Sequence, residues 1–274
     1  MLSGWLLLVL AACRPSPEAP GEMNDLSRYL YRHWDSADED VREAGVAALY
    51  EVIRDVDPEE SVIDRSWAMD PLEDGDVVGM EHPNRDLSAL VGVGVASRSP
   101  WPITEHARVQ TLDDQAPFEP SAVDYLRVFP DADEPDCFAD ASCEVLVSFN
   151  EARRQNVLFR VNFELHKVFR WVDVTLRDGE PRRAFYSRSW FSQPWPGDRD
   201  NVTLWQSFSL DVWIEDDRGG TLRYQVPWNE FDLGISVTDT AAIATVRGGT
   251  DDIFRTTDRM IAELWHDGEL PEVK

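Results

Sequence analysis

The chain has 274 residues, and 43% of them are hydrophobic and 11% aromatic, which is enough apolar material for a buried core. It carries 26 Lys and Arg residues against 52 Asp and Glu residues, a formal net charge of −26. A surface of that charge repels nucleic acid and bare anionic membranes, so the composition argues against nucleic acid as a partner.

The charge is uneven along the chain. Residues 150–188 contain nine Lys and Arg residues against five Asp and Glu residues. This local excess either neutralises part of an acidic surface or forms a face that accepts anions. The first interpretation needs fewer assumptions, and the sequence leaves both open.

An apolar run at residues 6–12, too short to span a bilayer, ends in Leu10-Ala11-Ala12-Cys13. These four residues resemble the lipobox of bacterial lipoproteins, although residues 1–4 lack the Lys or Arg that usually opens such a signal. The resemblance implies a signal peptide at residues 1–12, a diacylated Cys13 and attachment to the membrane of the cell envelope through the acyl chains. In such lipoproteins an Asp after the cysteine signals retention at the inner membrane, and here that residue is Arg14. If the organism has an outer membrane, the resemblance therefore implies a location there, facing the periplasm or the cell surface.

The next segments predict a tether and a small helical unit. Residues 13–23 are rich in proline and suit a stiff tether. Residues 24–58 have apolar side chains at helical spacing, with a second helix announced by a capping box of Ser36 and Glu39. Residues 59–86 are acidic and interrupted by Pro and Gly, so we expect an irregular linker. An α+β domain at 87–268 and a tail at 269–274 complete the division.

Alternating residues predict a broad antiparallel sheet. Residues 90–96 read as a buried strand, and residues 103–112 and 122–129 as short helices. Strand patterns then follow in close succession, which predicts a meander. The phase of the alternation changes at residues 166–168, where we expect a bulge or a tight bend. The longest pattern, residues 201–215, places one set of apolar side chains on a single face: Val202, Leu204, Phe208, Leu210, Val212 and Ile214.

Two tryptophans, Trp205 and Trp213, fall on the opposite, polar face of this strand. They mark a contact surface or are covered by the N-terminal helices.

A closing helix is predicted after Gly248 and Gly249, ending before Gly268. Its apolar stripe of Ile253, Met260, Ile261 and Leu264 is expected to cover the apolar face of the long strand. The fold class is therefore α+β: an antiparallel meander with a long C-terminal helix packed on it, preceded by a small N-terminal helical segment.

This order of elements is similar to the helix-grip arrangement of START and Bet v 1-like proteins, over about two thirds of the mature chain and without a shared motif. The similarity implies an apolar cavity between sheet and helix, the usual place for a lipid.

The acidic loop at residues 131–144 contains Cys137 and Cys143. With Cys13 acylated in an exported protein, we expect these two to form a disulfide. A calcium loop is not expected, because Pro135 occupies a ligand position and Asp136 replaces the turn glycine.

No hydrolase, zinc-protease or phosphate-loop motif occurs, and the five histidines are scattered. We therefore expect a non-enzymatic envelope lipoprotein without cofactor or metal. Two alternatives stay open: an assembly lipoprotein that contacts another envelope protein through its helical segment, and a hydrolase without a recognisable motif. The first hypothesis is binding of a lipid or other hydrophobic ligand, with these residues as its site: Leu204, Phe208, Leu210, Val212, Met260 and Leu264.

Overall fold

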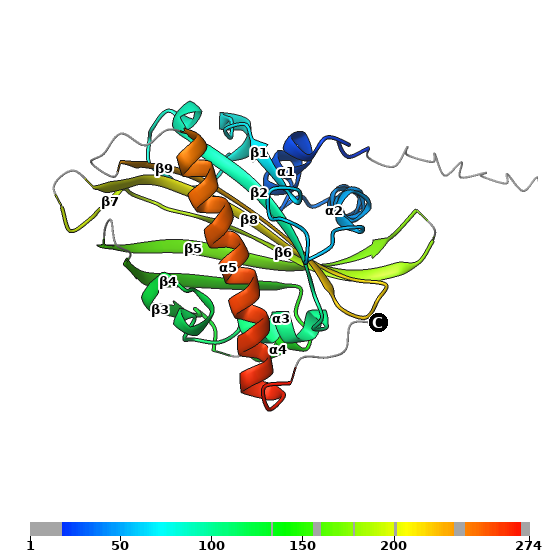
Figure 1. Ribbon diagram of the computed structural model, residues 1–274. Coiled ribbons are helices and arrows are strands. Elements are labelled where there is room, and N and C mark those ends of the chain that lie inside the picture. Colours follow the sequence, from blue (N-terminus) through cyan, green and yellow to red (C-terminus); the bar gives the residue numbers. More distant parts are fainter. Residues whose placement is uncertain are drawn as a thin grey trace, which may run out of the picture.

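The computed structural model describes residues 18–132, 134–155, 160–177, 179–199, 202–232 and 239–269. The expected signal peptide and Cys13 lie outside these residues. The described chain forms a nine-stranded antiparallel sheet with helices on both faces (Figure 1), which confirms the predicted α+β class. None of the described helices is long and apolar enough to cross a membrane.

The strands are β1 (Ser66–Met69), β2 (Val91–Ser99), β3 (Ala122–Val128), β4 (Val145–Gln155), β5 (Arg160–Thr175), β6 (Pro181–Trp190), β7 (Trp195–Pro196), β8 (Thr203–Glu215) and β9 (Thr221–Asp232). The helices are α1 (Met23–Arg32), α2 (Glu39–Ile53), α3 (Ile103–Gln110), α4 (Glu134–Ala139) and α5 (Asp239–Trp265), with short 3-10 turns η1 (Asp74–Asp76), η2 (Leu87–Ala89) and η3 (Ala116–Phe118). In space the strands follow the order β1-β2-β9-β8-β6-β5-β4-β3, with β7 beside β8. The long strands β4, β5, β6, β8 and β9 therefore pair in chain order, as the predicted meander requires.

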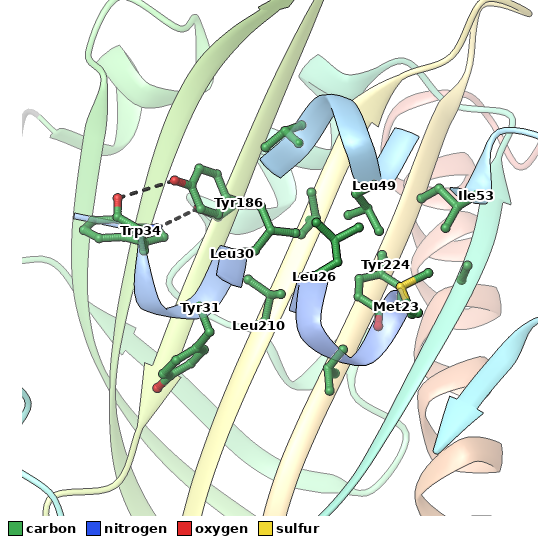
Figure 2. Packing of buried hydrophobic residues seen from close by; sticks show 14 of the residues in the cluster. Met23, Leu26, Leu30, Tyr31, Trp34, Leu49, Ile53, Tyr186, Leu210 and Tyr224 are labelled. Carbon is green, nitrogen blue, oxygen red and sulfur yellow. Dashed lines mark hydrogen bonds between the residues drawn. The ribbon is translucent and has the colours of Figure 1, made fainter. Parts of the chain in front are cut away.

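Helices α1 and α2 cover the apolar face of β8. Leu26, Leu30 and Leu49 pack with Leu210 and the even-numbered residues around it in the largest core cluster (Figure 2). The prediction that the C-terminal helix covers this face is wrong. The N-terminal segment satisfies it first, because its own apolar stripes need burial and cannot find it within two short helices.

The long helix α5 crosses the opposite face of the sheet, steeply to the strands (Figure 1). Its first half packs on β2, and Phe254 forms a cluster with Val93 and Val95. Its second half packs Ile261 on Trp101 and other residues around α3. The helix begins at Asp239, before the Gly248-Gly249 pair, so the prediction that the pair precedes the helix is wrong.

Three local predictions in the first half of the chain also need correction. Residues 122–129 form strand β3 rather than a helix, because they pair with β4 from Ala122 to Val128. The expected linker contains β1, which extends the sheet beside β2. Helix α2 has Asp38 at its N-cap without a side-chain capping bond, so the Ser36–Glu39 capping box is absent.

No bulge occurs at residues 166–168, since β5 keeps one register with β4 and β6. The apolar phase changes for another reason: the two halves of β5 are covered on different faces. Phe163 packs in a cluster with Tyr125, whereas Val172 packs in the cluster that contains α2.

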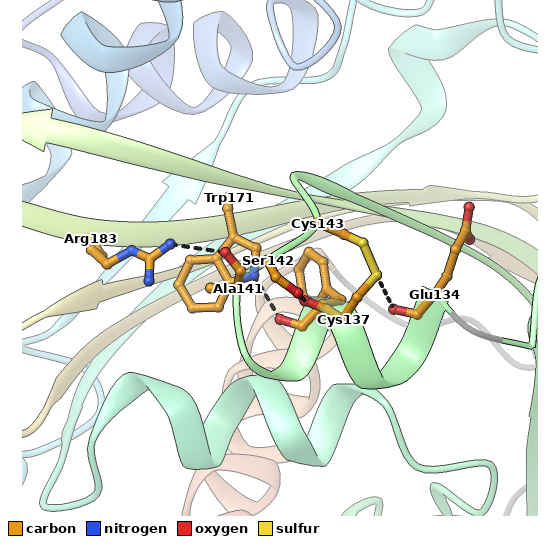
Figure 3. The surroundings of a disulfide bond; sticks show 8 residues. Glu134, Cys137, Ala141, Ser142, Cys143, Trp171 and Arg183 are labelled. Carbon is orange, nitrogen blue, oxygen red and sulfur yellow. Dashed lines mark hydrogen bonds between the residues drawn. A yellow bond between two sulfur atoms is a disulfide. The ribbon is translucent and has the colours of Figure 1, made fainter.

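The disulfide between Cys137 and Cys143 is present, with a Cα–Cα distance of 5.2 Å (Figure 3). The expected surface loop around it contains helix α4, and Phe138 of this helix is fully buried. The Trp171 indole nitrogen donates to the Phe138 carbonyl oxygen at 2.9 Å. The bridge therefore closes a small loop that is also attached to the sheet.

Candidate functional site

A cavity of about 60 Å³ lies between α5 and the sheet, on the face opposite α1 and α2. This volume is large enough for a few water molecules or a very small ligand. Successive side chains of a strand point to opposite faces, so the residues that face α5 are the sequence neighbours of those that face α1. The polar and charged residues of the wall are Gln110, Gln115, Glu119, Arg127, Lys167, Asp211, Arg223, Gln225 and Thr257.

Lys167 and Asp211 form one ion pair of the wall. The Lys167 ammonium donates to Asp211 Oδ2 at 2.6 Å, across strands β5 and β8. The hydroxyls of Ser187 and Ser209 each donate to the same carboxylate at 3.0 Å. Asp211 thus has three donors, and the pair is neutral as a whole.

Arg223 is paired from behind the cavity wall by Asp258 of α5, at 2.8 and 3.0 Å. Burial lowers the pKa of Arg223 and raises the pKa of Asp258, and each charge opposes the shift of the other. Asp258 also accepts from the Ser99 hydroxyl at 2.6 Å, and His106 Nε2 lies 2.9 Å from the same hydroxyl. A buried polar network therefore ties α5 to β2, α3 and β9.

Ser99, His106 and Asp258 do not have the geometry of a catalytic triad. In a triad the carboxylate bonds to the imidazole, whereas here Asp258 bonds to the serine. Ser99 and His106 are also fully buried. Among the described residues, no three His, Cys, Asp or Glu side chains gather closely enough to hold a metal ion.

Arg127 has a different environment from the other two basic residues of the wall. It is 3% exposed, and its hydrogen bonds go to the side-chain oxygen of Asn150, at 2.8 Å, and to the main-chain and side-chain oxygens of Gln110. The ring of Phe169 lies 5.2 Å away. Within the described part of the chain, no carboxylate is within ion-pair distance of this guanidinium. Burial lowers the pKa of Arg127.

The rest of the wall is largely apolar and aromatic, and includes Val109, Phe118, Tyr125, Trp213, Ile253 and Phe254. Phe254 and Ile253 come from α5, so this helix forms one side of the cavity. Gln225 has a side-chain oxygen that is buried and has no hydrogen-bond partner among the described residues. The cavity therefore combines an aromatic surface with polar groups that can still bond.

The residues predicted to bind a ligand do not gather at this cavity. Only Val212 belongs to its wall. Phe208 and Leu210 lie in the core beneath α1 and α2. Leu204 packs beside Phe163 and Phe191, Met260 packs near Trp101, and Leu264 is 49% exposed. The physical reason is that α1 and α2 cover the face of the sheet on which Phe208 and Leu210 lie. The prediction had placed the C-terminal helix over that face.

The tryptophans on the other face of β8 are not covered by the N-terminal helices. Trp213 stacks on Phe185, with ring centroids 4.5 Å apart, in a cluster with residues of α3. Trp205 lies under the Arg85 guanidinium at 4.3 Å.

Arg127 and Arg223 are not among the site residues predicted from the sequence. A usable signal was present for Arg223, because a long basic side chain between Leu222 and Tyr224 is unusual in an alternating strand. Arg127 had no such signal, because residues 122–129 read as a helix. Lys167 does lie in the basic segment 150–188, for which an anion-accepting face was one interpretation.

Several solved structures are similar to part of this chain. Ara h 8.0201 gives a TM-score of 0.35 at 10% identity, covering 64% of this chain and 99% of that chain. The protein TTHA0849 from Thermus thermophilus gives 0.35 at 12% identity, with coverage of 64% and 99%. Human STARD10 gives 0.37 at 9% identity, with coverage of 75% and 74%. Similarity at this level assigns no function to the chain.

No protein-family model matches the sequence, and a comparison with curated proteins finds no match.

Proposed function

We propose that this protein is a non-enzymatic lipoprotein of the cell envelope, anchored through Cys13, that binds a small molecule between α5 and the sheet. The observation that carries the proposal is the cavity under α5, whose wall contains buried polar groups without a full set of partners. A buried polar atom left unbonded costs about 1–3 kcal/mol. Two such atoms belong to residues of the wall: Arg223 Nε, a donor, and Gln225 Oε1, an acceptor. A ligand that accepts from the first or donates to the second from inside the cavity would recover that energy.

The wall also supports the hydrophobic component that the sequence suggested. Phe118 and Phe254 offer aromatic surface to an apolar part of the ligand. A cavity of about 60 Å³ is, however, well below the roughly 300–1,000 Å³ of a site for a drug-sized ligand. The ligand is thus small in this state, and a long-chain lipid would require α5 to move away from the sheet.

The alternative role in assembly through the helical segment has less support. The apolar side chains of α1 and α2, including Leu26 and Leu49, are fully buried against the sheet. They leave little apolar surface on this segment for a partner protein.

Native mass spectrometry of the full chain, purified from its own envelope, tests the proposal. We expect a small molecule to copurify. Thr257→Trp places a bulky ring in the cavity wall and should remove the bound mass. Asp252→Trp puts the same ring on an exposed position of α5 and should leave the bound mass in place.

Circular dichroism establishes that both variants are folded. Protein that carries no small molecule, or Thr257→Trp protein that is folded and still carries it, would contradict the proposed site. A copurifying subunit in place of a small molecule would favour the assembly role.

A further inference from the structure

Among the charged residues of the cavity wall, one basic side chain has no ion-pair partner within the described part of the chain. Lys167 is neutralised by Asp211 and Arg223 by Asp258. The remaining acid of the wall, Glu119, pairs at 2.7 Å with Arg154, which lies outside the wall. Within the described residues, each of these charges has a counter-charge at ion-pair distance. The guanidinium of Arg127 has no carboxylate that close, and Glu119 and Asp211 act on it only from farther away.

An unpaired buried guanidinium is costly. Removing an ion from water carries a penalty of several kcal/mol, and neutral hydrogen-bond acceptors recover only part of it. Arg127 has neutral acceptors only, namely Asn150 and Gln110. An anion inside the cavity would supply the missing charge.

The choice among anions follows from geometry and size. A guanidinium presents planar pairs of N–H donors that match the two oxygens of a carboxylate. One unpaired arginine compensates one negative charge, which fits a carboxylate better than a doubly charged phosphate. The aromatic wall formed by Phe118 and Phe254 would lie against the carbon atoms of the same molecule.

We infer that the cavity binds a small organic monoanion whose carboxylate pairs with Arg127 and whose carbon skeleton lies against the aromatic residues under α5. This inference rests on the proposed function and specifies its ligand class. The carboxylate can belong to a short free acid or to the headgroup of a fatty acid. The second source requires α5 to move, because the present volume is too small for a long chain.

Isothermal titration calorimetry of the full chain, freed of copurified ligand, tests the inference with matched probes. We expect propionate or butyrate to bind and the corresponding amides, propionamide and butyramide, to bind at least about tenfold more weakly. This threshold corresponds to about 1.4 kcal/mol. Dodecanoate distinguishes the two sources of the carboxylate: binding of dodecanoate with no binding of the short acids identifies a lipid headgroup. Tighter binding of inorganic phosphate than of any carboxylate would overturn the inference.

Arg127→Met should weaken carboxylate binding roughly 30-fold or more, since removing one partner of a buried charge pair costs at least about 2 kcal/mol. Arg153→Met is the matched control. It makes the same change on the neighbouring strand β4, at a largely exposed arginine that pairs with Asp124, and binding should be unchanged. Arg127→Lys keeps the charge and should retain part of the affinity.

The outcomes separate this inference from the proposed function. Equal binding of acids and amides, unaffected by Arg127→Met, would overturn the carboxylate and leave the cavity as a binding site. Absence of binding by every probe, together with no copurifying molecule, would overturn both. If Arg127→Met fails to fold, the comparison of acids with amides on the unaltered chain still shows whether the cavity requires a carboxylate.

Discussion

At the scale of single residues, the interior of this protein contains many charges, and nearly all of those described are paired. Arg98 pairs with Asp216, Arg65 with Asp251, and Arg223 with Asp258, each pair largely or fully withdrawn from water. Breaking such a pair by removing one partner is strongly destabilising, because an uncompensated charge remains. These ion pairs therefore fix the positions of β2 and α5, whereas Arg127 has no carboxylate within ion-pair distance among the described residues.

His106 gives the fold a dependence on pH. Burial, and then the positive charge of Arg223, hold the pKa of His106 well below its ordinary value of 6.5. Below pH 6.5 the unfolded chain binds a proton at this residue that the folded chain does not. Stability attributable to His106 is thus fully present above pH 6.5 and falls as the pH is lowered, by up to about 1.4 kcal/mol per pH unit.

The neutral variant His106→Gln should lose this dependence while it keeps a polar group near Ser99. The measurement is urea unfolding of both proteins at intervals between pH 8 and pH 5. We expect the difference in unfolding free energy between them to change below pH 6.5, in the direction of a relatively more stable variant. Parallel curves over the whole range would contradict the buried, neutral state of His106.

At the scale of elements, α5 is one continuous helix in spite of the glycine pair near its middle. A glycine inside a helix destabilises it by about 0.5–1 kcal/mol relative to alanine. A Cβ added at Gly248 or Gly249 would meet nothing within 4 Å, so neither glycine is required by close packing. Both precede Ile253 and Phe254, which line the cavity. The pair is therefore a weak point of the helix next to the proposed site.

Gly249→Ala should raise the unfolding free energy by about 0.5–1 kcal/mol, because the new methyl group is exposed and the backbone is already helical. Chemical denaturation measures this change. If α5 must bend for the ligand to enter, the same substitution should also slow ligand association in stopped-flow experiments. A destabilised Gly249→Ala protein would show that the helix requires glycine there.

At the scale of the whole molecule, the two faces of the sheet are packed in different ways. One face is a filled apolar core under α1 and α2, and the other holds the cavity and the buried polar network under α5. The described chain begins next to α1, with the proline-rich residues before it. A charge of −26 gives the body no attraction to an anionic membrane surface. Anchoring would thus rest on the acyl chains alone.

Cys13→Ala should release the protein from the membrane while leaving the body folded, since in the proposed lipoprotein two acyl chains would supply the anchor and the strongly acidic body offers no electrostatic substitute. Fractionation of cells that express either form, followed by immunoblotting, measures the distribution. Retention of the variant in the membrane fraction would contradict the assignment of the anchor. A parallel Cys137→Ala, Cys143→Ala form, which keeps Cys13, should remain with the membrane.

The sequence by itself determined the long strands β4, β5, β6, β8 and β9, because alternation along a strand is a local property that does not depend on which layer covers it. It did not determine β3, which was predicted as a helix. It also predicted the disulfide between Cys137 and Cys143, on the expectation that Cys13 is acylated. It did not determine which helix covers which face. Val212 and Trp213 are adjacent in the chain, yet they pack in different clusters on opposite faces of the sheet. The alternation shows that a strand has two faces, but not which helix covers each of them.

Only the tertiary structure decided the site. Arg127, Lys167 and Arg223 lie on strands that are distant in sequence, and the pairing of the last two with Asp211 and Asp258 depends on the order of the strands and on where α5 crosses them. Whether a buried arginine has a counter-charge is a property of that arrangement. Composition alone shows 52 acidic residues and gives no indication that the guanidinium of Arg127 has no carboxylate within ion-pair distance among those the structure describes.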